Sequence, residues 1–255
     1  MSTIIEISRL TFLEAIRNNI IYGVLAFISL LLLAVTALAV VTMGRTELMI
    51  IDLGLGAISL IGNLMAIIFT IQTIQLEKEG RTLYVLLTRL NSRWQYIAGK
   101  YIGLASVLGL QIIIMSLILA FFVAFFGHIE WISLTQACFT TILEIWIVIA
   151  IAMIFAQTSS LFLAFLLTLC VDIAGRFTSV IHQLGEHASS DIMRFLSDVM
   201  YYALPNLEMI NLRNGAGYIV SFPWHEIAAI SAYSTIEILF ILALSCWIFS
   251  RRNLS

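Results

Sequence analysis

The strongest constraint on the fold of this chain is a series of long, uninterrupted apolar segments. A helix needs about 20 predominantly apolar residues to cross the hydrocarbon core of a bilayer. Backbone groups inside lipid must form their hydrogen bonds within the protein, which leaves only helices or a closed barrel. The segments lack the alternation of barrel strands, so they predict helices. The predicted spans are residues 20–43, 50–76, 97–126, 134–156, 160–180 and 227–250.

The composition agrees with a membrane protein. Hydrophobic residues make up 61% of the chain and charged residues only 11%, whereas about a quarter of the residues in a soluble domain are charged. We therefore expect an all-α, polytopic membrane protein with six transmembrane helices in a single domain, residues 1–255. The net charge of −2 does not favour a nucleic-acid partner.

The distribution of Lys and Arg predicts the orientation in the membrane. With the N-terminus inside, nine basic residues lie on the cytoplasmic side and three on the outer side, and Arg176 lies near the outer end of the fifth span. This bias predicts that both termini are cytoplasmic. The four histidines then face outward at spacings that match no metal motif, so we predict no metal site. They are His128, His182, His187 and His225.

Two segments outside the spans are expected to be helical. Residues 1–19 are amphipathic, and Ile4, Ile5 and Phe12 share one arc of a helical wheel. This pattern predicts an interfacial helix on the cytoplasmic leaflet. Residues 181–226, between the fifth and sixth spans, are too apolar for a free loop. We expect them to form short outer helices that re-enter or cap the outer face.

The cytoplasmic loop at residues 77–96 carries a second helical pattern. Four leucines recur at positions i, i+3, i+4 and i+7, which places them on one face of a helix. The rest of the loop is rich in Lys and Arg. Such a helix can lie on lipid headgroups or dock into a groove on a partner protein. The leucines are Leu83, Leu86, Leu87 and Leu90.

Three acidic residues, Glu144, Asp172 and Glu237, lie inside predicted spans. Intramembrane carboxylates are costly, and they indicate either function or specific pairing. Arg176 follows Asp172 by one helical turn, so these two side chains can form an ion pair. The acids can line a substrate path or carry protons. Alternatively, Glu144 and Glu237 are protonated and form hydrogen bonds between helices, while the Asp172 pair is structural.

Polar side chains also occur in the second span. Asn63 and Gln72 can line a pathway, or they can join helices through hydrogen bonds. The residues alone leave both interpretations open.

Short motifs in the loop and before the last span resemble a known family. They are Glu77-x-Glu79-x-x-Thr82, Leu86-Leu87-Thr88-Arg89, Ser92-Arg93, Tyr96-Ile97-x-Gly99-Lys100-Tyr101, Leu204-Pro205-Asn206-Leu207-Glu208 and Asn211-Leu212-Arg213. Together with the layout of the spans, they resemble the permease subunits of type-2 ABC exporters. Within that family they are most similar to the NosY-like branch, which is linked to multicopper-enzyme maturation. The loop departs from the family at Leu90, where many members carry proline.

The resemblance implies a permease that pairs with a second copy or a paralogue in the cell membrane, the bacterial inner membrane. A separate ATPase subunit would hold ATP and Mg, because this chain has no Gly-x-x-x-x-Gly-Lys-Ser/Thr phosphate loop. No catalytic site and no cofactor are expected in the chain itself. Membrane lipid and an accessory protein on the outer face are further expected partners.

The resemblance also implies roles for particular residues. The loop 77–96 would be the coupling helix that inserts into the ATPase. The second and fifth spans would approach the dimer axis, which places Asn63, Gln72, Asp172 and Arg176 on the translocation path. The residues assigned to ATPase coupling are Glu77, Glu79, Arg81, Thr82, Leu83, Leu86, Leu87, Arg89 and Arg93.

Two other functions compete with this hypothesis. A proton-coupled secondary transporter or an intramembrane enzyme could use Glu144, Asp172 and Glu237. The chain shows no two-half repeat, which secondary transporters often have. It also has no His-Glu-x-x-His or comparable catalytic pair within a span.

Overall fold

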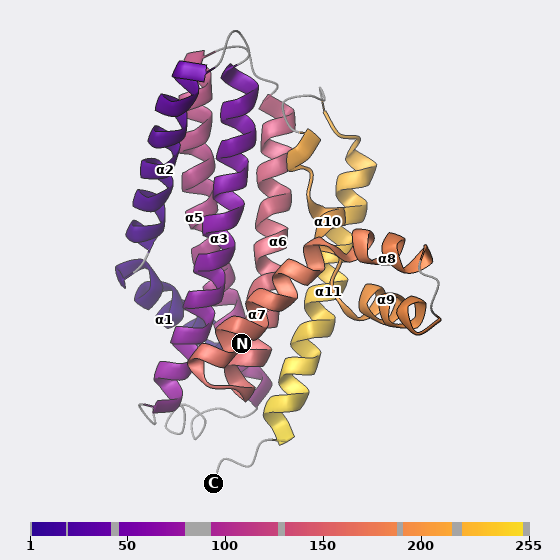
Figure 1. Ribbon diagram of the computed structural model, residues 1–255. Helices are drawn as coiled ribbons and strands as arrows, with labels where there is room; N and C mark the ends of the chain where they lie inside the picture. The colour runs from indigo at the N-terminus through magenta and orange to yellow at the C-terminus, as the bar shows by residue number, and fades with distance from the viewer. Residues whose placement is uncertain are drawn as a thin grey trace.

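The structure is a computed structural model that describes residues 2–18, 20–41, 46–79, 93–126, 131–187, 191–215 and 221–251. Throughout these ranges the chain is helical or forms short connections, as the apolar segments predicted (Figure 1). The helices are α1 (Ser2–Asn18), α2 (Ile20–Val41), α3 (Thr46–Glu79), α5 (Arg93–Phe126), α6 (Trp131–Thr158), α7 (Leu161–Arg176), α8 (Thr178–Glu186), α9 (Asp191–Ala203), α10 (Leu207–Ile210), the 3-10 helix η1 (Arg213–Gly215) and α11 (Trp224–Arg251).

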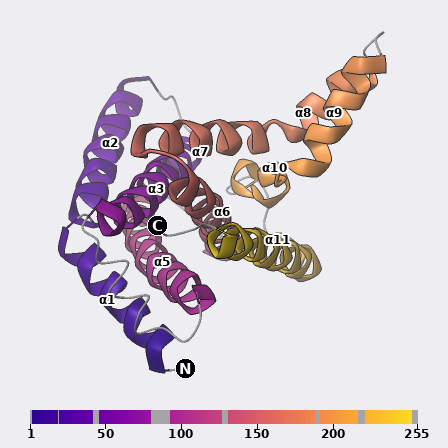
Figure 2. The same ribbon diagram turned by 90° about the horizontal axis from the view of Figure 1, so that it is seen from below.

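The long helices form one upright bundle with alternating directions (Figure 1). We call the end that holds Glu79, Arg93 and Arg251 the lower end, and the end that holds Trp131 and Trp224 the upper end. Helices α3 and α6 lie at the centre, with α5, α2 and α11 around them, as the view from below shows (Figure 2). The bundle therefore brings together segments that are far apart in the sequence.

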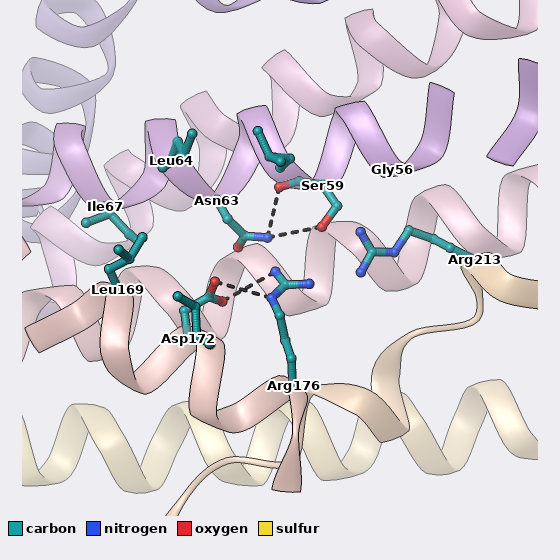
Figure 3. A pocket seen from close by; sticks show the side chains of 11 residues that line it. Gly56, Ser59, Asn63, Leu64, Ile67, Leu169, Asp172, Arg176 and Arg213 are labelled. Atoms are coloured by element: carbon teal, nitrogen blue, oxygen red, sulfur yellow. Dashed lines mark hydrogen bonds and ion pairs between the residues drawn. The ribbon is translucent and has the colours of Figure 1, made fainter. Parts of the chain in front are cut away.

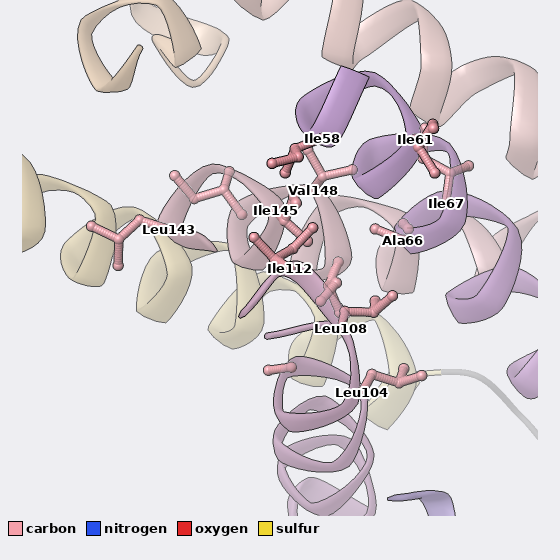
Figure 4. Close-up of a cluster of buried hydrophobic side chains, with 14 of the residues drawn as sticks. Ile58, Ile61, Ala66, Ile67, Leu104, Leu108, Ile112, Leu143, Ile145 and Val148 are labelled. Carbon is pink, nitrogen blue, oxygen red and sulfur yellow. The ribbon is translucent and has the colours of Figure 1, made fainter. Parts of the chain in front are cut away.

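Interlocked aliphatic side chains hold the centre of the bundle together. Ile58 and Ile67 of α3, Leu108 of α5, and Ile145 and Val148 of α6 are all buried and belong to one core (Figure 4). In a bilayer, water does not drive this contact, because lipid is as apolar as the side chains. Close packing and hydrogen bonds between helices must supply the stability.

The described residues contain four helices that are individually long and apolar enough to cross a membrane: α3, α5, α6 and α11. A fifth span results if α7 and α8 are counted together, although they are bent by 61° at their junction. In α2 the comparable apolar stretch, Tyr22–Val35, is shorter. The structure therefore supports four or five spans, and the sixth remains a prediction.

The span predicted at 160–180 is helical from Leu161 to Arg176, where α7 ends, and α8 leaves in another direction. Two contacts lie at the break. The Thr178 hydroxyl donates to the Gly175 carbonyl at 3.2 Å across the end of α7. Gly175 itself lies against the backbone of Pro205, whose carbonyl oxygen would be only 2.8 Å from an added Cβ. The segment around Pro205 therefore passes directly against the end of α7.

The region after α7 divides into two parts. Helices α8 and α9 pack on each other and project sideways from the bundle, and they do not cap its upper end (Figures 1 and 2). By contrast, α10 and η1 return to the bundle, where Leu207 and Ile210 are buried. The prediction of short helices is confirmed for this segment, and only its second part re-enters the bundle.

The N-terminal helix α1 packs along the lower part of α5 through two glycines. A Cβ added to Gly99 would lie 3.0 Å from Ile7, and one added to Gly103 would lie 2.7 Å from Thr11 Cβ. Ile7 and Thr11 are consequently buried, whereas Ile5 is 66% exposed. The helical wheel could not show that the glycines open a groove for Ile7 and Thr11, and the exposed Ile5 leaves the interfacial orientation of α1 a prediction.

The glycine contact predicts opposite outcomes for the same substitution at two positions of α5. Alanine at Gly109 should be neutral or stabilising, because its nearest neighbour would be Trp146 Nε1 at 3.7 Å and alanine favours a helix by about 1 kcal/mol. Alanine at Gly103 should lower the melting temperature, because its Cβ would meet the Ser8 carbonyl at 2.9 Å. Thermal unfolding in detergent measures both variants. Equal stability of the two would contradict the close approach of α1.

Candidate functional site

A cluster of charged side chains lies near the middle of the bundle, centred on Glu144 of α6. Glu144 is 1% exposed. Its Oε1 forms an ion pair with Arg176 and accepts a hydrogen bond from Asn63 Nδ2 at 3.1 Å. Its Oε2 faces Arg213 Nη2 at 3.3 Å. The Ser59 hydroxyl lies 3.5 Å from Oε1. One carboxylate thus joins residues from α3, α6, α7 and η1.

Helix α7 contributes the second acid of the cluster. Asp172 and Arg176 are one turn apart, and Arg176 Nε donates to Asp172 Oδ2 at 3.2 Å while Nη2 lies 3.4 Å from Oδ1. The predicted pair is therefore confirmed in its geometry. Its setting differs from the prediction, because Arg176 also pairs with Glu144 and so links α7 to α6.

The re-entering segment holds Arg213 in position. Asn211 Oδ1 accepts hydrogen bonds from Arg213 Nε at 2.9 Å and from the Arg213 backbone at 3.1 Å. Upstream, Asn206 caps the short helix α10 by accepting from Met209 at 3.1 Å, and its backbone N–H donates to the Tyr233 hydroxyl at 2.9 Å. These bonds fix the segment to α11, and they orient the Arg213 side chain toward the bundle.

The cluster borders a cavity of about 420 Å³ between α3, α7 and η1 (Figure 3). Arg176 and Arg213 point toward the same space from different elements, and Ser59 and Asn63 lie across from them on α3 (Figure 3). Aliphatic side chains line the remainder. The lining residues are Gly56, Ser59, Leu60, Asn63, Leu64, Ile67, Leu169, Asp172, Ile173, Arg176 and Arg213. The cavity is therefore charged on one part of its wall and apolar on the rest.

The two arginines and two acids balance one another in formal charge. An isolated charge in an apolar interior is costly, and removal of its partner leaves that cost uncompensated. Glu144 contacts two guanidinium groups as well as the Asn63 amide, so its partners are charged side chains from α7 and η1 in addition to a neutral group on α3.

The other polar residues predicted for the spans lie elsewhere. Gln72 is exposed and is not among the residues that line the cavity. Glu237 is half-buried on α11 and also lies outside the cavity lining. The structure thus brings Asn63, Asp172 and Arg176 together and leaves Gln72 apart.

A second polar cluster joins the lower ends of the helices, and it includes both end residues of the predicted loop 77–96, since Glu77 belongs to α3 and Tyr96 to α5. Glu77 forms an ion pair with Lys100, which is 1% exposed, and accepts a hydrogen bond from the Tyr96 hydroxyl. Lys78 donates to backbone carbonyls at the end of α6, including that of Gln157 at 2.9 Å. Gln75 donates to the Ser159 carbonyl at 2.7 Å. Helices α3, α5 and α6 are therefore tied together at this end.

Most of the predicted coupling residues lie outside the described part of the chain. Glu77 is described, while residues 80–92 are not, and neither are the side chains of Glu79 and Arg93. The roles of this group thus remain predictions. The group consists of Glu79, Arg81, Thr82, Leu83, Leu86, Leu87, Arg89 and Arg93.

The comparisons with known proteins bear on the whole chain. The model of the ABC-2 family transporter proteins matches residues 10–254. The chain belongs to the ABC-2 family of transporter proteins. A search of curated proteins finds no match. Family membership, together with the apolar helices, makes this ABC-2 protein a multi-pass membrane protein and the transmembrane subunit of an ABC transporter. It also implies an ATPase partner, which agrees with a chain that has no phosphate-binding loop.

The sequence did not reveal Arg213 and Ser59 as site residues of this ABC-2 protein. Arg213 was assigned to the outer side by its place in the chain, although its side chain reaches Glu144. The run from Leu204 to Leu212 carried a usable signal, because a Pro-interrupted apolar stretch too short to span the membrane is typical of a re-entering segment.

Because Glu144 is a partner of both arginines and Glu237 is not, we predict that replacement of each acid by glutamine has different effects on stability. Glu144→Gln should strongly lower the melting temperature, since loss of one member of a buried charge pair costs about 3–5 kcal/mol. Glu237→Gln, on a half-buried residue outside the cluster, should change it little. Thermal unfolding in detergent measures both. A Glu144→Gln variant as stable as Glu237→Gln would show that the arginines do not depend on this carboxylate.

Proposed function

We propose that this chain is the permease of an ATP-driven exporter of the NosY-like type. In this proposal two permease chains pair in the bacterial inner membrane, with both termini cytoplasmic and an interfacial α1. A separate ATPase subunit binds each permease at residues 77–96. The family match and the motifs in the loop support this assignment. Lipid surrounds the permease pair, and the outer segment offers a surface for an accessory protein.

The observation that carries the proposal is the continuity of α3 between the loop and the charged cluster. Glu77, the first residue of the predicted loop, lies near the lower end of α3, and Ser59 lies beside Glu144 on the same unbroken helix. Eighteen residues separate them, a distance of about 27 Å at about 1.5 Å per residue. A straight helix can transmit displacement over this length, so a push on the loop shifts one wall of the cavity against α7.

The lower polar cluster makes such a push act on several helices together. Glu77 joins the end of α3 to Lys100 and Tyr96 of α5, the helix on the other side of the loop. The Tyr96 ring stacks on Phe249 of α11, with ring centroids 5.7 Å apart. The two helices that flank the loop are thereby coupled to each other and to the last span.

The two competing functions require three acids to act together. Glu144 and Asp172 share Arg176 as a partner, whereas Glu237 lies on α11 outside the cavity lining. This separation favours a transporter that changes shape over a proton relay or a catalytic centre built from all three acids.

The coupling role of the loop predicts the outcome of a double substitution at its leucines. Leu86→Asp with Leu87→Asp should reduce ATP-dependent transport at least tenfold and abolish stimulation of the ATPase, because an apolar contact with the partner is replaced by two charges. The amount of protein in the membrane should not change. Leu86→Ile with Leu87→Ile serves as the matched control. Normal association and transport by the aspartate variant would refute the coupling assignment.

The proposed orientation can be tested at opposite ends of α11. Single cysteines replace Ser221, which precedes the helix, or Ser250, in its last turn, after Cys138, Cys170 and Cys246 have been changed to serine. An impermeant thiol reagent should label the cysteine at 221 in intact cells, and the cysteine at 250 only after the membrane is opened. The reverse pattern would mean that the orientation is inverted.

A further inference from the structure

Within the part of the chain that the structure describes, the two arginines at the cavity retain unused hydrogen-bond donors. Arg176 contacts Asp172 and Glu144 through Nε and Nη2, and Arg213 contacts Asn211 and Glu144 in the same way. No polar contact among the described residues uses Nη1 of either arginine. A guanidinium has five N–H donors and no acceptor, so both arginines can accommodate a further acceptor.

The acidic partners face away from the cavity or are already engaged. Glu144 is 1% exposed and is not part of the lining. Both oxygens of Asp172 lie within hydrogen-bond distance of Arg176. Asp52 does not line this cavity but an adjoining hollow of about 400 Å³, which shares Gly56 and Arg213 with it. The charged part of the main cavity therefore offers mainly donors, which favours an anionic group.

One further polar atom at this wall lacks a partner. Asn63 Nδ2 donates toward Glu144 and Ser59, while its Oδ1 has no hydrogen-bond partner among the described residues. A buried polar atom without a partner costs about 1–3 kcal/mol. This oxygen is an acceptor, so only a ligand group or water that donates a hydrogen bond could complete its bonding.

The rest of the cavity suits a hydrocarbon chain. Leu64 and Ile67 of α3 face Leu169 and Ile173 of α7 along the wall. Leu60 and Ile173 are 58% and 47% exposed, so this side of the cavity opens outward from the subunit. Its volume of about 420 Å³ falls in the range of about 300–1,000 Å³ that holds small-molecule ligands.

We propose that this cavity binds an amphiphile with an anionic headgroup. The headgroup lies against Arg176 and Arg213, and the apolar chain lies between α3 and α7. The inference rests on the proposed function, because in a transporter such a molecule would be the transported substrate or a lipid that occupies the substrate path. Its binding to the chain does not require the ATPase.

The test measures lipid binding to the full chain purified in dodecyl maltoside, by titration in native mass spectrometry. Dioleoylphosphatidylglycerol should bind about tenfold or more tightly than dioleoylphosphatidylcholine, because the neutral headgroup carries an ammonium beside two arginines. Inorganic phosphate alone should not compete, since it lacks the apolar chain. Equal binding of the two lipids would overturn the proposal. Competition by phosphate at similar concentrations would overturn the assignment of an amphiphile.

Two variants locate the binding in the cavity. Gly56 is exposed, and a Cβ at this position would meet nothing within 4 Å, so Gly56→Leu fills the cavity without a clash. Arg213→Gln removes a donor and leaves Glu144 paired with Arg176. Each should weaken phosphatidylglycerol binding about tenfold, as expected for loss of one charge-assisted contact. Ser106→Leu, exposed on α5, is the control and should bind normally. Unchanged binding by Gly56→Leu would refute the location.

The result can be separated from the test of the proposed function. If the two lipids bind equally well but the Leu86 and Leu87 variant loses coupling, only the ligand assignment is refuted. If the chain selects phosphatidylglycerol but that variant keeps normal coupling, the coupling assignment is refuted and the lipid site is supported.

Discussion

The carboxylate of Glu144 is the interaction on which the centre of this protein depends. It pairs with Arg176 from α7 and Arg213 from η1 while it accepts a hydrogen bond from Asn63 of α3. Each of these charges alone would be costly inside an apolar bundle. Their mutual pairing allows a broken helix, α7, and a re-entering segment to end at the same depth in the bundle. The site is therefore built where regular helical structure is interrupted.

The same interruption has a functional consequence. Continuous helices such as α3 and α6 pack along their whole length and can move as rigid rods. Helix α7 is attached at its upper end through ion pairs, and at its lower end it follows a short turn from α6. The cavity wall thus combines a long helix that reaches the loop with a short helix held both by ion pairs and by packing of Ala164 and Leu169 against the aliphatic core.

Several features could be predicted from the sequence because they depend on local pattern. The apolar lengths of 50–76, 97–126, 134–156 and 227–250 identified the helices α3, α5, α6 and α11, and the spacing of Asp172 and Arg176 identified their pair. The bend at Arg176 could not be predicted in this way. Gly175, beside the bend, lies against Pro205, which is 30 positions away, and hydropathy does not register a contact between such distant residues. The burial of Ile7 and Thr11 could not be predicted for a similar reason, since it depends on the groove that Gly99 and Gly103 open on α5.

The sequence by itself determined the solvent and the class of the fold. An 11% share of charged residues in long apolar runs leaves the bilayer as the medium and helices as the structure. Only the tertiary structure decided which polar residues act together. Arg213 lies 69 positions from Glu144, and Asn63 lies 81 positions from it, yet all three meet. The pattern of the sequence indicates which residues can be buried. The partners of buried charges are set instead by helix packing, because it joins residues that are far apart in the chain. This packing gives Glu144 two arginines and leaves Glu237 outside the cluster.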